Sequence, residues 1–170
     1  MKKLILLMLV LVTFNITATE MTDAQYTQYQ IEDFFSRSKY ANVSHIITAL
    51  AVLESGWFKS PSHICRNNYF SHTGDKTGHD CSGNICKKAI CHLSSYTSME
   101  KALEAQLTYF ESMGFPVDEK GFYEALKCIP FYKKPCRSYA VDPNHIKKIK
   151  IIVRRMEKKK KKELINIYPF

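Results

Sequence analysis

The chain has 170 residues, a formal net charge of +9 and six cysteines. This length predicts one domain with a single core and leaves little room for a second catalytic domain. An even number of cysteines at this density is typical of an exported protein with disulfide bonds. The positive charge alone does not favour nucleic acid, because an exported chain meets anionic wall polymers and lipid headgroups first.

The N-terminal segment has the layout of a secretory signal peptide. Lys2 and Lys3 precede an apolar run from Leu4 to Val12, and a polar stretch follows to Ala18. The apolar run is shorter than the ~20 residues that a membrane-spanning helix needs. We therefore expect residues 1–18 to be removed and the mature chain to be periplasmic or extracellular.

Two helices are predicted next along the chain. Thr22 and Gln25 have the spacing of a capping box, which predicts a helix start. A second helix is indicated by apolar residues at helical spacing, and Ser55-Gly56 is expected to end it. These apolar residues are Val43, Ile46, Ile47, Leu50, Leu53 and Trp57.

Residues 61–95 show no sustained period, which predicts an irregular lobe. Four cysteines fall in this segment, and six cysteines in all leave the disulfide pairing open, with a local Cys128–Cys136 bridge as our first expectation. Zinc is the alternative, because four histidines are interleaved with the same cysteines. We favour disulfides, and expect neither a metal nor a cofactor, since no C-x2-C pair occurs. The residues concerned are Cys65, Cys81, Cys86, Cys91, His63, His72, His79 and His92.

Regular helical spacing returns after the irregular segment. Thr97 and Glu100 predict a capping box, and Gly114 with Pro116 predicts the end of that helix. A short helix is then expected through Phe122, Leu126 and Ile129.

The last helix is predicted around Ile146–Val153, with Asp142 as its N-cap and Pro143 in its first turn. The predicted fold class is α+β and mostly helical, with a small disulfide-rich lobe inserted after the 43–57 helix. Residues 157–170 are expected to form a basic tail. Its run Lys158–Lys162 either contacts anionic wall polymers or lipid headgroups, or is a solvated chain end.

Glu54 is a carboxylate on an apolar helix face. At about 100° per residue, the apolar side chains of the 43–57 helix fill an arc of roughly 120° centred near Leu50, and Glu54 falls inside it. Burial raises a carboxyl pKa, as a general acid near neutral pH requires. The alternative is a glutamate that reaches past the helix end to solvent or to Arg66.

Aromatic residues near Glu54 in the sequence, or spread along the chain, are candidates for stacking on sugar rings. Each also suits a position in the core. They are Trp57, Tyr69, Tyr96 and Tyr139.

Four segments, in order, resemble the motifs of the glycoside hydrolase family 73 glucosaminidases. They are Ala-Val-Leu-Glu-Ser-Gly-Trp at 51–57, Asn-Asn-Tyr-Phe at 67–70, Ser-Tyr-Thr-Ser-Met-Glu at 95–100 and Ser-Tyr-Ala-Val-Asp-Pro at 138–143. The resemblance implies a lysozyme-like domain over residues 19–156. It also implies cleavage of the β-1,4 bond between N-acetylglucosamine and N-acetylmuramic acid in peptidoglycan.

The same resemblance assigns roles to single residues. Glu54 would be the general acid, and Tyr139 an active-site tyrosine that positions substrate or stabilises developing charge. Asn67 and Asn68 would shape the turn into the lobe, and Tyr69 could face the sugar. Together with the stacking candidates Trp57 and Tyr96, Asn68 and Tyr69 are the expected substrate-binding residues.

Two features depart from the family pattern. Tyr69-Phe70-Ser71 stands where the family usually has Leu-Phe-Gly, so the contacts of the lobe cannot be copied. Glycosidases normally use two carboxylates, and Asp75 and Asp80 are the candidates for the second. The acetamido group of the substrate is the alternative.

Two other functions use the same residues differently. A lytic transglycosylase would share Glu54 and release anhydro-muramic ends, while a non-catalytic secreted wall-binding protein would keep the fold and use its basic surface. In each case we expect glycan strands as the partner, a monomeric chain and no nucleic acid.

Overall fold

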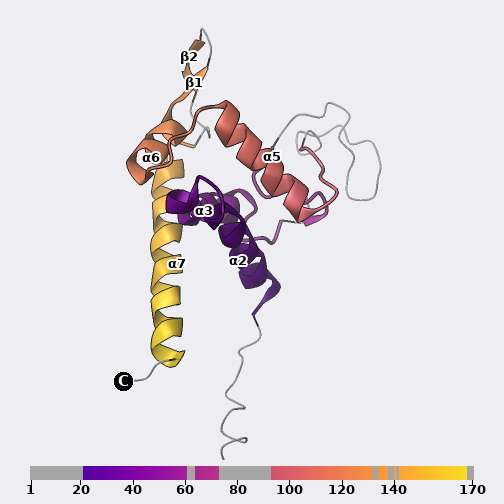
Figure 1. Cartoon of the computed structure of the whole chain (residues 1–170), viewed down its shortest axis with the longest axis vertical. Coiled ribbons are helices and arrows are strands. Elements are labelled where there is room, and N and C mark those ends of the chain that lie inside the picture. Colours follow the sequence, from indigo (N-terminus) through magenta and orange to yellow (C-terminus); the bar gives the residue numbers. More distant parts are fainter. Residues whose placement is uncertain are drawn as a thin grey trace, which may run out of the picture.

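The structure, a computed structural model, describes residues 21–60, 64–72, 93–131, 134–137, 140 and 142–167. Within these ranges the protein is mostly helical, as predicted, with five α-helices, one 3₁₀ helix and one two-stranded hairpin (Figure 1). The predicted disulfide-rich lobe lies largely outside the described residues. The elements are α2 (Asp23–Ser36), η1 (Ala41–Val43), α3 (Ser44–Glu54), α5 (Met99–Ser112), α6 (Glu119–Lys127), β1 (Ile129–Phe131), β2 (Lys134–Arg137) and α7 (His145–Ile167).

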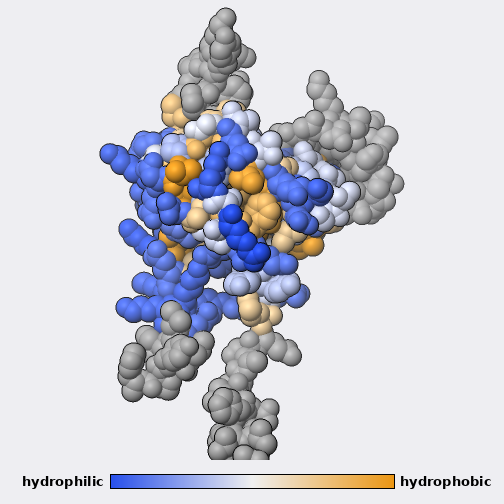
Figure 2. All heavy atoms as spheres, in the orientation of Figure 1, coloured by the Kyte–Doolittle hydropathy of each residue, from blue (hydrophilic) through white to orange (hydrophobic). Residues whose placement is uncertain are grey.

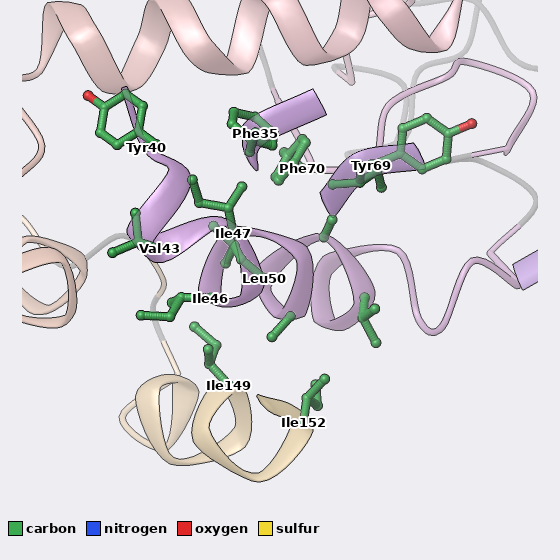
Figure 3. Close-up of a cluster of buried hydrophobic side chains, with 14 of the residues drawn as sticks. Phe35, Tyr40, Val43, Ile46, Ile47, Leu50, Tyr69, Phe70, Ile149 and Ile152 are labelled. Atoms are coloured by element: carbon green, nitrogen blue, oxygen red, sulfur yellow. The ribbon is translucent and has the colours of Figure 1, made fainter. Parts of the chain in front are cut away.

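Helix α3 is the centre of the core. It is buried on nearly all sides, since every residue from Ile46 to Val52 is buried. The buried surface is therefore wider than the apolar arc that the sequence predicted. Ile149 and Ile152 of α7 lie on one side of α3, and Phe35 and Phe70 lie on the other (Figure 3). Full burial of an aliphatic or aromatic side chain contributes about 1.5–3 kcal/mol. Packing on two sides therefore fixes α3, and with it the residue at its C-terminal end.

An aromatic cluster joins η1, α5 and α6. The ring of Phe110 lies 4.9 Å from that of Phe115 and 5.2 Å from that of Phe122, between ring centroids. Tyr40 packs against Phe110 at 5.7 Å, and its hydroxyl donates a hydrogen bond to the carbonyl of Phe115. The tilted and edge-on arrangements are those that the ring quadrupoles favour.

Local capping residues decide where the helices begin. The capping box of Thr22 and Gln25 is confirmed at the start of α2. The predicted start at Thr97 is wrong by one residue, because the Ser98 hydroxyl accepts the Lys101 amide and α5 begins at Met99. Ser98 is the residue three before that amide, which is the spacing that a capping hydroxyl needs.

Helices α3 and α5 end in the same way. Gly56 and Gly114 have φ values of 59° and 66°. The amides of these glycines donate to the carbonyls of Leu53 and Glu111, respectively. The amides of the residues that follow them, Trp57 and Phe115, donate to the carbonyls of Val52 and Phe110. This pair of bonds is the Schellman motif, which places glycine where the chain turns left-handed. The predicted ends at Gly56 and Gly114 are therefore confirmed, and Trp57, predicted on the helix face, lies beyond the helix.

We expect Gly114→Ala to lower the free energy of unfolding by about 1–2 kcal/mol, because an L side chain disfavours φ = 66° although the space around Gly114 is open. Gly114→Asn should lose less, since asparagine tolerates this conformation. Thermal denaturation of the two variants measures the difference. An equal loss in both would contradict backbone strain as the cause.

The C-terminal part differs from the sequence prediction in two places. Ile129 was expected in a helix but lies in β1, which pairs antiparallel with β2. Helix α7 begins at His145, two residues after Pro143, and the Asp142 side chain accepts the Asn144 amide before it. Helix α7 continues through the run Lys158–Lys162 to Ile167. Hydrophilic side chains cover the lower part of this helix (Figure 2). No helix among the described residues is long and apolar enough to cross a membrane.

Candidate active site

Glu54 is the last residue of α3, and its side chain is 19% exposed. Burial raises the pKa of this carboxyl above its ordinary value, and a hydrogen bond from Ser71 opposes the rise. The burial that helical spacing predicted is therefore present. The carboxyl is therefore largely buried but still partly accessible to solvent.

His145 faces Glu54 from the first turn of α7. Its Nε2 lies 3.6 Å from Oε1 of Glu54, and the imidazole is almost fully buried. Burial lowers the pKa of His145, while Asp142 raises it and Lys148 lowers it further. Burial therefore shifts both groups toward their neutral forms, the carboxylic acid of Glu54 and the uncharged imidazole of His145.

This arrangement suits proton donation. At 3.6 Å the pair is wider than a normal hydrogen bond, so the imidazole limits where the carboxyl can turn without taking its proton. The chemistry available is that of an acid that keeps its proton until an acceptor oxygen approaches. Sequence analysis missed His145, because no local pattern links the start of α7 to the end of α3. The only signal was its place three residues after Asp142.

The turn after Glu54 has an unusual backbone. Trp57 and Phe58 have φ values of 61° and 57°, which cost an L residue about 1–2 kcal/mol each. The Phe58 amide donates to Ser55 Oγ at 3.0 Å, and the Phe58 ring packs edge-on against Tyr69. Trp57 stays 42% exposed. The turn is held by Ser55 and Phe58, and it presents the indole at the surface.

Asn68 lies inside the fold. It is 1% exposed, and its amide nitrogen donates to the carbonyls of His72 and Ser94, each at 2.9 Å. Its oxygen accepts the His72 amide at 3.0 Å. Asn67, with φ = 49°, donates to the carbonyl of Tyr96. Both asparagines thus join residues 67–72 to residues 94–96. The substrate-binding role of Asn68 stays a prediction.

His72 and Tyr96 form a second polar contact. The Tyr96 hydroxyl lies 2.9 Å from His72 Nδ1, and His72 Nε2 contacts the Oε1 of buried Gln106. Burial lowers the pKa of His72 and raises that of Tyr96. A neutral imidazole with its proton on Nε2 satisfies both partners, because Nδ1 then accepts from the tyrosine. Tyr69, predicted with Tyr96 to bind substrate, is 8% exposed.

Arg66 is not the group beside Glu54. It is 4% exposed, and its guanidinium donates to the Leu93 carbonyl and the Ser95 hydroxyl. Tyr139, Asp75 and Asp80 lie outside the described residues, so their predicted roles are not tested. Within the described ranges no group of three or more His, Cys, Asp or Glu side chains is arranged to hold a metal ion. Cys65 and Cys128 are each disulfide-bonded, and their pairing stays a prediction.

Comparison with known protein families gives a match to this chain. Residues 31–158 match the family model described as mannosyl-glycoprotein endo-beta-N-acetylglucosaminidase, which places the chain among the glycoside hydrolases that act on glycans such as peptidoglycan. The chain belongs to this glucosaminidase family, glycoside hydrolase family 73, as its motifs predicted. No curated protein and no solved structure matches the chain.

Proposed function

We propose that the protein is a peptidoglycan hydrolase with a lysozyme-like fold, which cleaves the β-1,4 bond between N-acetylglucosamine and N-acetylmuramic acid. Glu54 is the general acid that protonates the leaving oxygen. The observation that carries this proposal is the buried, partly accessible carboxyl of Glu54, whose pKa burial raises, at the end of a rigid core helix. A carboxyl in this state holds its proton at a pH where an exposed glutamate has lost it.

The proposal for Glu54 does not depend on which group plays the second catalytic role. Among the described residues, the side chains placed at the Glu54 carboxyl are Ser71 and His145, and neither is an acid. Asp75, Asp80 and the acetamido group of the substrate remain the candidates for the second role, and Tyr139 for stabilising developing charge.

A single acid is also sufficient for the alternative function, a lytic transglycosylase. The two reactions differ in the ends that they leave on the glycan: a hydrolase leaves reducing ends, and a transglycosylase leaves anhydro-muramic ends. Mass spectrometry of purified peptidoglycan after digestion distinguishes them directly. Reducing N-acetylglucosamine ends are expected, whereas anhydro-muramic ends would replace the proposal by its alternative.

Ser71 provides a pH test of the same acid. Its hydrogen bond lowers the pKa of Glu54, so Ser71→Ala should raise that pKa further. The general acid then stays protonated to higher pH, and the alkaline fall of kcat/KM should move to higher pH. Ser112→Ala, at an exposed serine at the end of α5, is the control and should leave the profile unchanged. An alkaline fall of kcat/KM that moves to lower pH in Ser71→Ala would contradict the assignment of Glu54 as the general acid.

We also propose that the protein acts outside the cytoplasm after removal of residues 1–18. Export is supported by the N-terminal sequence and by the nature of the family substrate. The exposed run Lys158–Lys162 would then meet anionic wall polymers or lipid headgroups. N-terminal sequencing of the exported protein tests the cleavage.

A further inference from the structure

A pocket of about 250 Å³ lies between α2, the turn after α3 and the middle of α7. Trp57 and Phe58 form its apolar wall, Gln25 and Gln28 of α2 contribute amides, and Arg155 and Lys159 of α7 contribute positive charge. None of the described residues that line it is acidic. Its volume lies below the ~300–1,000 Å³ of clefts that bind drug-sized ligands, so it suits a single ring rather than a long strand.

The turn that carries Trp57 is built in a way that core packing does not require. Three consecutive residues, Gly56, Trp57 and Phe58, have positive φ values, and two of them carry large side chains. Of these two aromatic rings, Phe58 is 9% exposed and Trp57 is 42% exposed. Strained backbone that leaves an indole at the rim of a pocket is a reason to look for a ligand there.

The pocket wall also has the chemistry of an acidic sugar site. An indole face suits the apolar face of a sugar ring, and side-chain amides can bond its hydroxyl or acetamido groups. Arg155 and Lys159 are exposed cations suited to a carboxylate. Lys159 lies 3.9 Å from Glu163, but both side chains are about half exposed, and such a pair is weak in water. Lys159 therefore remains able to bind an anionic ligand.

We propose that this pocket binds one sugar residue that carries a carboxylate, as muramic acid does in a glycan strand. The proposal rests on the proposed function, which supplies the strand. Glu54 contacts α7 at His145, and Arg155 lies ten residues further on, about 15 Å along the helix axis. Neither Glu54 nor His145 lines the pocket, so the pocket is a subsite beside the reacting bond and not the place of cleavage.

Trp57 is the single tryptophan of the chain, so its fluorescence reports on this pocket alone. We use Glu54→Gln to prevent cleavage, and titrate it with the disaccharide of N-acetylglucosamine and N-acetylmuramic acid, and with neutral chitobiose. The acidic disaccharide should change the indole spectrum in a saturable way, with an affinity about tenfold or more above that of chitobiose. Calorimetry on a further Trp57→Ala variant should show the same binding lost, while Tyr26→Ala, at an exposed α2 residue outside the pocket lining, should retain it.

The charge-matched controls lie on the same helix. Arg155→Gln with Lys159→Gln should weaken binding of the acidic disaccharide about tenfold or more and leave chitobiose unchanged. Lys147→Gln with Arg154→Gln removes two exposed cations from α7 outside the pocket and should change neither affinity.

Four results would overturn the subsite. The first is an indole spectrum that does not change while calorimetry detects binding. The second and third are equal losses of affinity in the two double variants and equal affinity for the two disaccharides. The fourth is a preference for a phosphate-bearing wall polymer over the acidic disaccharide. None of these results affects cleavage of peptidoglycan by the wild type. Failure of the proposed function would instead appear as intact glycan after wild-type digestion, whatever binds at Trp57.

Discussion

Glu54→Gln is expected to reduce peptidoglycan cleavage about 10²–10⁴-fold, the range that general acid catalysis contributes. Glutamine has nearly the shape of protonated glutamic acid, and it can occupy the same space beside His145, but it cannot give a proton to a leaving oxygen. The loss should therefore fall on kcat more than on KM. Release of reducing ends from purified peptidoglycan, measured over time, gives both constants.

Glu104→Gln is the matched control. It makes the same chemical change at a glutamate that is 46% exposed on α5 and pairs with Lys101. Its activity should equal that of the wild type. If Glu54→Gln retained full cleavage, or if both variants lost it equally, Glu54 would not be the acid. Retained wall binding without any wild-type cleavage would instead support a non-catalytic wall-binding protein.

The stability of the wild type, compared with that of Glu54→Gln, should depend on pH in the direction opposite to that of a carboxyl held in an ion pair, whose pKa is lowered. The pKa of Glu54 is raised in the folded state, so the folded protein binds this proton more tightly than the unfolded chain does. Stability from this group is then full below the ordinary value of 4.5 and is lost as pH rises through the folded pKa. Relative to wild type, Glu54→Gln should gain thermal stability at neutral pH and lose that gain below 4.5.

Most helix ends were predictable because their signals are local. Thr22 with Gln25, Gly56 and Gly114 each act within a few residues, through hydrogen bonds that short spacing fixes. The same locality explains the error at Thr97, where Ser98 is an equally good cap one residue on. Because Thr97 and Ser98 both carry hydroxyls, the backbone geometry decides which of them caps the helix, and sequence spacing does not determine that geometry.

The environment of Glu54 was predictable only in part. Helical spacing placed the acid among apolar residues, and Glu54 is largely buried, although α3 is buried on nearly all sides and not on one face alone. The group opposite it depends on how α7 crosses α3, so His145 was missed. Trp57 was placed on the helix face, since its spacing fits the period although the helix ends at Glu54. Tertiary packing decides the position of His145, whereas Trp57 lies beyond the helix because the chain turns at Gly56.

Asn68→Ala should destabilise the fold by about 3 kcal/mol or more. The change removes three hydrogen bonds. It leaves the Ser94 carbonyl and the His72 amide without this partner, whereas the His72 carbonyl still accepts the Ser94 amide. Each such loss costs about 1–3 kcal/mol, although the costs are not fully additive. For a domain of this size the midpoint of thermal unfolding should fall by roughly 10 °C. Circular dichroism during heating measures this fall.

Asn67→Gly is the neighbouring control, because it removes one hydrogen bond and at the same time relieves a positive φ. It should lose much less stability than Asn68→Ala. Kinetics below the unfolding transition then separate the two roles of Asn68. A normal KM in the folded Asn68→Ala variant means that the side chain acts by holding residues 68–72 against residue 94. A KM raised about tenfold, with stability unchanged, would mean that it binds substrate instead.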